Sequence, residues 1–509
     1  MKKVFNKFKK DTVKEIKKHP VIYACLFVVL LLSLFLRVYR TEALLGFYYD
    51  QGRDAMVIWR LWQDHKFFMI GPVTGLAGIF LGPFYYYLIA PFYLLSGGDP
   101  VIPAVFLAIL STIAIYVVYV LGKEFEDRIT GLIAAVIAGF SYYIVLASRW
   151  LSNPTSILLT SVLLLLSMWK IVKGESKRWW IVIALLIGLS LHFEAASAVF
   201  YLPMILVFAL WQRKNFPNIK ILLISAIVLL GTFLPQIIFN LRHGNLFVNN
   251  FRQMLVEENS FKLSFWEVLS VRLNYFWTVF HSKILPGLEM WVVVLSVVVL
   301  RISIKRKKEF NKKPLILLAI FIGVPMIGFI FFQGNSGNIY DYYMTGYYLP
   351  LILLFSMGLA KLLKTNIGKI VFLIFFIMFF ARNGLFLKNY LKAGVDGPAH
   401  ITLGNELQAV NWILEDAGER GEFNVDVYVP PVIPHSYDYL FLWQATEKCG
   451  DDICQMNLAE RVPLLYTLQE EDPPHPERLE AWYARQEGIG IVEEEVRFGG
   501  VSVQRRTRI

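Results

Sequence analysis

The feature that most constrains this chain is a series of apolar runs, each close to 20 residues long. A transmembrane helix needs about 20 apolar residues to cross the hydrocarbon core of a bilayer. Runs of about that length predict eleven spans, at 21–39, 101–121, 129–147, 155–172, 179–193, 196–211, 220–239, 290–304, 314–332, 347–363 and 369–387. The sequence therefore predicts a polytopic α-helical membrane protein.

Composition and charge agree with a membrane protein followed by a second, water-soluble domain. The chain is 56% hydrophobic and 17% charged, whereas soluble domains are about 25% charged. Residues 1–387 carry 39 Lys and Arg against 18 Asp and Glu, but residues 388–509 carry 11 against 21. Cytoplasmic loops of membrane proteins collect Lys and Arg, so we infer no nucleic-acid binding from the basic part. We expect a membrane domain over 1–387 and an acidic domain over 388–509.

The segment 80–96, "FLGPFYYYLIAPFYLLS", decides the topology. It is apolar, but it contains two prolines and many aromatic residues, which favours a re-entrant or interfacial helix. The N-terminus and the basic loops then all fall on the cytoplasmic side, as the positive-inside rule requires; these loops are 123–128, 173–178, 212–220, 305–313 and 361–369. We therefore expect a multi-pass protein of the cell membrane with a cytoplasmic N-terminus. Its outer side would hold 41–100, 148–154, 241–289, 333–346 and the C-terminal domain.

The C-terminal segment predicts a small α/β domain. The stretch "LGNELQAVNWILEDAG" has apolar residues at helical spacing, with Gly418 as its stop. The stretches "FNVDVYV" and "VPLLYTL" have strand character, and a hairpin is expected around Gly499 and Gly500. Cys449 and Cys454 would close a small disulfide in an oxidising compartment, and two free thiols are the alternative.

The first outer loop, 41–100, opens with "FYYDQGRDA" and continues as an amphipathic helix with interfacial Trp residues. Asp50 and Asp54 are four residues apart, so a helix that starts early places both on one face, flanked by Arg53. Charge is costly in a bilayer, so the cluster must either lie in water or have a function. The structural alternative makes Asp50 the N-cap of the helix, with the acidic residues complementing the helix dipole.

The segments that follow complete a recognisable arrangement. A Gly-Pro turn leads into the aromatic segment 80–96, and a "GGDP" turn leads into the second span. Together with "YDQGRDA", this order resembles the GT-C superfamily of membrane glycosyltransferases, which includes the protein O-mannosyltransferases and the lipid A aminoarabinose transferase. The resemblance covers about residues 20–390 by topology, and its specific motifs lie within 47–100 and a few further loop positions.

The resemblance implies a hexosyl- or pentosyl-transferase whose donor is a sugar on a polyprenyl phosphate. A hydroxyl of a glycan, lipid or protein acceptor would attack the anomeric carbon on the outer face of the membrane, inverting its configuration. Such a reaction needs a base for the acceptor proton and positive charge or a metal ion at the leaving phosphate. Asp50 matches the motif acid and is the expected base, and the expected ligand if a divalent metal takes part. Asp54 would either assist Asp50 or hold Arg53.

Three other outer clusters are candidates for the same cavity. Arg149 in "SRWLSNP" would hold a phosphate, or else it is an interfacial arginine that reaches toward water. His192 and Glu194 in "LHFEA" suggest cavity lining, because a glutamate beside a histidine is uncommon within a membrane. Tyr340, Asp341, Tyr342 and Tyr343 in "GNIYDYYMTGYYLP" would contact a sugar, although an interfacial tyrosine belt explains the tyrosines equally well.

The chain departs from the family pattern at two positions. Relatives often carry His or Lys beside the proline of the first loop, where this chain has Gly82. Relatives also often have an acid near Asn153, so the amide here weakens a metal site at this point. The positive charge for the phosphate must then come from elsewhere, and the candidates are Arg53, Arg149, Arg242 and Arg272.

A transporter or flippase of a lipid-linked sugar is the alternative function. Ion-coupled transporters usually place ionisable residues near the middle of their spans and show two similar halves. In this chain the centres of the spans are almost free of charge, and no half repeats the other. The pattern therefore favours chemistry at the membrane surface over passage through the membrane.

Overall fold

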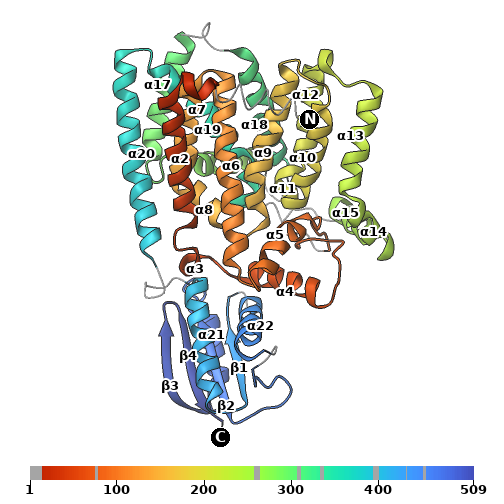
Figure 1. Cartoon of the computed structure of the whole chain (residues 1–509), viewed down its shortest axis with the longest axis vertical. Coiled ribbons are helices and arrows are strands. Elements are labelled where there is room, and N and C mark those ends of the chain that lie inside the picture. The colour runs from red at the N-terminus through yellow and green to blue at the C-terminus, as the bar shows by residue number, and fades with distance from the viewer. Residues whose placement is uncertain are drawn as a thin grey trace.

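The computed structural model describes residues 14–74, 78–256, 264–305, 311–332, 338–393, 401–430, 433–450 and 454–508. A bundle of helices stands on a small α/β domain (Figure 1). The bundle comprises α2 (Pro20–Val38), α3 (Thr41–Leu44), α4 (Tyr49–Gln63), α5 (Phe84–Leu95), α6 (Val101–Phe125), α7 (Arg128–Phe140), α8 (Tyr142–Arg149), η1 (Asn153–Ser156), α9 (Ile157–Val172), α10 (Trp179–Phe193), α11 (Ala195–Ala198), α12 (Tyr201–Trp211), η2 (Arg213–Asn215), α13 (Ile219–Thr232), α14 (Leu234–Arg242), α15 (Leu246–Val256), α16 (Phe265–Ser282), α17 (Glu289–Lys305), α18 (Lys312–Ile330), η5 (Asp341–Met344), α19 (Thr345–Leu362) and α20 (Asn366–Lys392).

Each of the eleven predicted spans coincides with a helix or a pair of consecutive helices. Some of these helices are shorter than a membrane span. Among the described residues, six helices are long and apolar enough to cross a membrane. Two bent pairs, α7 with α8 at 64° and α13 with α14 at 53°, raise that number to eight if each pair is one span. The chain is therefore a mostly helical protein with six to eight membrane-capable segments, and eleven spans remain a prediction.

The basic loops meet at one end of the bundle. Arg128 pairs with Glu15 at 2.6 Å, and Lys361 pairs with Glu126 at 2.7 Å. The side chain of Lys177 donates to the carbonyl of Phe216 at 2.8 Å. The described parts of the loops that the positive-inside rule assigns to one side thus contact one another across the bundle. The first outer loop lies at the opposite end, beside the C-terminal domain (Figure 1).

The aromatic segment forms the short helix α5. Its twelve residues span about 18 Å, whereas the hydrocarbon core is about 30 Å thick. Helix α5 is shorter than this core, but so are α10 and α12, which coincide with predicted spans. The interfacial or re-entrant course of 80–96 therefore remains a prediction.

The C-terminal domain is α/β, as predicted. It comprises α21 (Leu403–Gly418), β1 (Phe423–Tyr428), α22 (His435–Cys449), β2 (Leu464–Glu470), α23 (Pro476–Gln486), β3 (Ile491–Phe498) and β4 (Val501–Thr507). The sheet has the order β1-β2-β4-β3, with β1 parallel to β2 and the other pairs antiparallel. Helix α21 ends at Gly418, and the predicted hairpin turns at Gly499 and Gly500. Cys449 and Cys454 form a disulfide, which confirms the first of the two alternatives.

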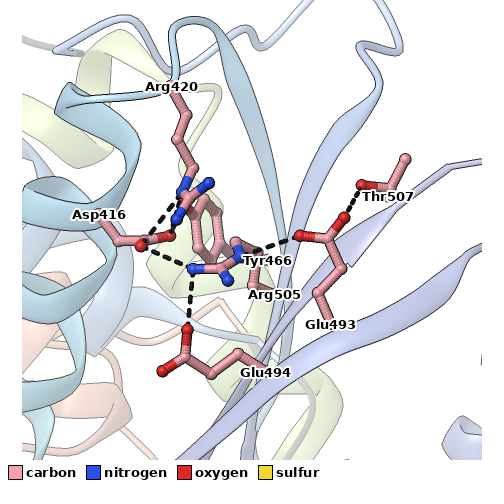
Figure 2. A network of polar contacts seen from close by, with 7 residues as sticks. All are labelled: Asp416, Arg420, Tyr466, Glu493, Glu494, Arg505 and Thr507. Carbon is pink, nitrogen blue, oxygen red and sulfur yellow. Dashed lines mark hydrogen bonds and ion pairs between the residues drawn. The ribbon is translucent and has the colours of Figure 1, made fainter.

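A network of charged side chains holds α21 to the sheet (Figure 2). Arg505 on β4 pairs with Asp416 of α21 at 2.7 Å. The same guanidinium contacts Glu493 at 3.1 Å and Glu494 at 2.9 Å, both on β3. The phenol of Tyr466 donates to Asp416 at 2.6 Å. One arginine therefore joins three elements of the domain.

The C-terminal domain and the first outer loop share one hydrophobic core. Buried residues of the loop, such as Phe47 and Ile58, belong to the same cluster as Leu403 and Tyr437 of the C-terminal domain. The N–H of Leu403 also donates to the carbonyl of Leu45 at 2.8 Å. The boundary expected near 388 thus separates two stretches of sequence that pack together.

Candidate active site

A cavity of about 1250 Å³ lies where the first outer loop faces α10 to α15. Its polar lining comes from distant parts of the chain and includes Asp50, Arg53, Ser152, Asn153, Glu194, Gln236, Asn240, Tyr342 and Tyr343. Its apolar lining is larger and includes Leu191, Val199, Phe200, Leu230, Phe233, Ile237, Leu241, Phe247, Val248, Phe331 and Phe332. The cavity can therefore receive a molecule that has both a polar head and a long apolar part.

The motif "FYYDQGRDA" leads into α4 and forms about its first two turns. Tyr48 is at the N-cap position, and its N–H donates to the side-chain oxygen of Gln51 at 3.1 Å. Asp50 is not the N-cap, so that part of the structural alternative is wrong, whereas its place relative to the helix dipole is the one that the alternative expected. It lies in the first turn, where the helix dipole favours a negative charge.

Arg53 holds both carboxylates of the motif. Its Nη1 atom lies 2.8 Å from Asp50, and its Nε and Nη2 atoms lie 3.0 Å and 2.8 Å from Asp54. The phenol of Tyr86, on α5, donates to the same oxygen of Asp54 at 2.9 Å. The side chain of Asp50 is 56% exposed and that of Asp54 is 7% exposed. Asp50 is thus accessible at the wall of the cavity, whereas Asp54 is a buried anchor for Arg53.

Burial changes the electrostatics of this group, which lies outside the membrane-spanning segments. Burial raises the pKa of Asp54 to about 6, against the lowering effects of Arg53 and of the bond from Tyr86. Burial alone would lower the pKa of Arg53, but the charge of Asp54 and the other nearby acidic groups raise it above its usual value. Arg53 is therefore a permanent cation beside a carboxyl that titrates near neutral pH.

The structure separates His192 from Glu194. Glu194 lines the cavity, and its carboxylate accepts the N–H of Ala196 at 3.1 Å. His192 is absent from the described lining. Its Nδ1 atom accepts the N–H of Phe84 at 3.3 Å, so its Nε2 atom carries the proton and donates to the carbonyl of Thr232 at 2.9 Å. His192 thus ties α10 to α5 and α13.

The same histidine explains the departure at Gly82. A Cβ atom on Gly82 would lie 2.1 Å from Nδ1 of His192. The ring occupies the space that a larger side chain at position 82 would need.

The other candidate cations are absent from the described lining of the cavity. Arg149 donates to the carbonyls of Leu36 and Tyr39, both at 3.0 Å, and to the phenol of Tyr390 at 3.1 Å. Arg272 donates to the carbonyl of Phe332, and Arg242 ends α14 with no place in the lining. Among the described residues that line the cavity, Arg53 is the one cation.

Two of the four candidate residues before α19 line the cavity. Tyr342 and Tyr343 line it, whereas Tyr340 and Asp341 do not. Asp341 pairs with Lys283 at 2.9 Å, and the exposed ring of Tyr340 stacks on Tyr342 at 5.5 Å. The cavity therefore lies beside the second half of this candidate cluster, and a contact with a sugar stays a prediction.

Sequence reasoning missed Tyr86, Trp150 and Gln236. Tyr86 was one of several aromatic residues in a predicted interfacial helix, and no spacing rule connects it to Asp54. Trp150 lies beside Arg149 in a loop that was singled out. Gln236 is a polar residue in the apolar run 220–239, which is a signal for a cavity. Its amide donates to the carbonyl of Phe80 at 3.2 Å, and its side-chain oxygen is buried without a hydrogen-bond partner among the described residues.

A metal site at Asp50 does not fit the described residues. They contain no group of three His, Cys, Asp or Glu side chains that could hold a metal ion. The guanidinium of Arg53 already contacts Asp50, and Asn153 in the same lining is an amide rather than an acid. The chemistry below therefore has no step through a metal.

Comparisons with known proteins agree with this architecture. Residues 81–239 match the model of the family described as dolichyl-phosphate-mannose-protein mannosyltransferase. A comparison with curated protein sequences finds no match. ArnT from Cupriavidus metallidurans, in a crystal structure with undecaprenyl phosphate, is similar with a TM-score of 0.57 at 10% identity, covering 96% of this chain and 98% of ArnT.

A second group of similar structures comes from Archaeoglobus fulgidus. Its oligosaccharyltransferase AglB, in complex with an inhibitory peptide and a dolichol-phosphate, has a TM-score of 0.50 at 13% identity. That match covers 89% of this chain and 70% of AglB. The family match and the shared fold confirm the resemblance: the chain has the architecture of the GT-C membrane glycosyltransferases.

Proposed function

We propose that the protein is a glycosyltransferase that moves a sugar from a polyprenyl-phosphate donor to an acceptor hydroxyl on the outer face of the membrane, with inversion at the anomeric carbon. The observation that carries the proposal is the cavity itself. It combines an accessible carboxylate and a permanent cation with a long apolar wall. A lipid phosphate needs both a cation for its head and an apolar surface for its chain.

The reaction assigns one role to each charged residue. The carboxylate of Asp50 takes the proton of the acceptor hydroxyl while the hydroxyl oxygen forms a bond to the anomeric carbon. The bond from that carbon to the phosphate oxygen breaks, and the polyprenyl phosphate leaves with the electron pair. Arg53 stabilises the negative charge that develops on the phosphate. Asp54 and Tyr86 keep Arg53 in place.

The lipid chain of the donor is placed against the apolar wall of the cavity. Leu230, Ile237 and Leu241 lie on α13 and α14 and line the cavity, so a polyprenyl chain would lie against these helices. Tyr342 and Tyr343 offer aromatic surface for a sugar ring. The acceptor would come from the aqueous side, where Asp50 is accessible.

The test is release of polyprenyl phosphate from polyprenyl-phosphate-linked sugars by the purified protein, with a panel of glycan, lipid and protein acceptors. We expect release by the wild type and a loss of at least a thousandfold in Asp50→Asn. The amide keeps the shape of the side chain but cannot take the proton.

Asp64→Asn is the matched control. Asp64 follows the same helix, is exposed and pairs with Lys66 at 3.1 Å, and it does not line the cavity. It should leave the rate unchanged. Full activity of Asp50→Asn would contradict the assignment of the base, and absence of release by the wild type with every donor and acceptor would contradict the function.

A further inference from the structure

Helix α4 has two functional faces. Asp50 and Arg53 lie on the face toward the cavity. Gly52, Ala55 and Trp59 recur at intervals of three and four residues, so they lie together on another face. These three residues are buried, and α22 of the C-terminal domain packs against α4. The C-terminal domain therefore contacts the helix that carries the motif directly.

The two helices approach each other closely at Gly52. A Cβ atom on Gly52 would lie 2.3 Å from the carbonyl carbon and oxygen of His435 and 2.4 Å from the nitrogen of Ser436. Glycine is unfavourable inside a helix compared with alanine. Its presence in the first turn of α4 is explained by the backbone of α22, which occupies the space of a side chain. The ring of His435 also lies against Tyr49, with 4.8 Å between the ring centroids.

A second close approach secures α22 at the other end of the loop. The backbone of Gly98 has a φ of +106°, and a Cβ there would lie 2.8 Å from the ring of Trp443 and 2.9 Å from the ring of Trp59. The hydroxyl of Tyr439 donates to the carbonyl of Gly98. The ring of Tyr439 is fully buried. It lies about 6 Å from the rings of Phe47, Trp59 and Tyr93.

We infer that α22 positions the catalytic turn, by which we mean residues Asp50 to Arg53 of α4. The backbone of α22 at His435 and Ser436 packs against Gly52, and the hydroxyl of Tyr439 anchors α22 to Gly98. These two contacts fix the positions of Asp50 and Arg53 at the wall of the cavity. This inference rests on the proposed function. It gives the C-terminal domain a role in the chemistry, although none of its residues lines the described cavity.

The size of the effect follows from the geometry at Gly52. Ordinary contacts of a Cβ atom begin at 3.4 Å, so an added methyl group must separate α4 from the backbone of α22 by about 1 Å. A displacement of about 1 Å at a catalytic group can cost about a hundredfold in rate. Gly52→Ala should therefore lower the rate of release at saturating donor roughly a hundredfold. The donor should still bind, because the apolar wall of α13 and α14 is untouched.

The experiment measures single-turnover release of polyprenyl phosphate at saturating donor in the full-length protein, normalised to the number of donor-binding sites. This normalisation separates a misplaced catalytic turn from a fraction of unfolded protein, which would bind no donor. Gly384→Ala is the matched control. Gly384 lies inside α20 with open space where its Cβ would be, so this variant should release product at the wild-type rate.

Tyr439→Phe is the second variant. It keeps the buried ring and removes the hydroxyl that donates to Gly98, so a several-fold lower rate per donor site is expected. Wild-type rates per site in both Gly52→Ala and Tyr439→Phe would overturn the inference while leaving the proposed function intact. If Gly52→Ala does not fold, a wild-type rate in Tyr439→Phe alone would overturn it. An inactive wild type would instead contradict the proposed function.

Discussion

Two arginines of this protein each join several carboxylates, and the settings differ. Arg53 connects Asp50 and Asp54 within one helix at the wall of a cavity. Arg505 connects Asp416 on α21 to Glu493 and Glu494 on β3 (Figure 2). In the first group one carboxylate is left more than half exposed to the cavity, whereas the second group closes the contact between a helix and a sheet.

The pKa values of Asp54 and Asp416 shift in opposite directions, although each arginine acts to lower the pKa of its partner. Burial dominates at Asp54 and raises its pKa to about 6. Burial also acts to raise the pKa of Asp416, but the hydrogen bonds from Tyr466, Arg505 and Arg420 outweigh it, and the pKa falls below its usual value. An ion pair alone therefore does not identify a functional site. A cavity beside the pair and a carboxyl that titrates near neutral pH distinguish the first group from the second.

The largest difference should appear when each arginine is replaced by glutamine. Arg53→Gln removes the one cation of the described cavity lining, so we expect kcat to fall by about a hundredfold to a thousandfold, the range found when a donor to a developing negative charge is lost. Steady-state release of polyprenyl phosphate measures the effect. Arg505→Gln is the matched variant and should retain the wild-type kcat. An equal loss of kcat in both variants would contradict a catalytic role that belongs to Arg53 and not to Arg505.

A smaller effect is expected at Asp54. As the pH falls through about 6, Asp54 takes up a proton and Arg53 loses a charged partner, so the activity of the wild type should decline on the acid side. Asp54→Asn should be about tenfold slower, because a neutral acceptor replaces a charge-assisted bond. Its pH–rate profile should also lack the step near pH 6. If the variant keeps the change in rate near pH 6, the titrating group is a residue other than Asp54.

The smallest effect concerns stability. Arg505→Gln should lower the free energy of unfolding of the C-terminal domain by roughly 1 kcal/mol, as expected for a partly exposed network of charges. The pKa of Asp416 is lowered by folding, so its contribution is present above the unfolded pKa of about 3.9 and is lost as the pH falls from there through the lower folded pKa. Hydrogen exchange of α21 at pH 7 and at a pH below that folded pKa would measure this, and a difference between wild type and variant that grows toward acid pH would contradict it.

The sequence predicted what depends on neighbours along the chain. Apolar runs located the helices, alternation located β1 and β2, and the four-residue spacing placed Asp50 and Asp54 around Arg53. Contacts between distant segments were not predictable. The hydrogen bond from Tyr86 to Asp54 connects residues 32 positions apart. The packing of the His435 backbone against Gly52 brings together residues from near opposite ends of the chain. Arg149 had the right chemistry for a phosphate, but the carbonyls at the end of α2 engage it.

The most direct test of the central claim is a structure of the protein with polyprenyl phosphate bound in a lipid nanodisc. We expect the phosphate within hydrogen-bonding distance of the guanidinium of Arg53 and the polyprenyl chain along Leu230, Ile237 and Leu241. A phosphate held by Arg149 or Lys283, with no lipid in the cavity beside Asp50, would contradict the account.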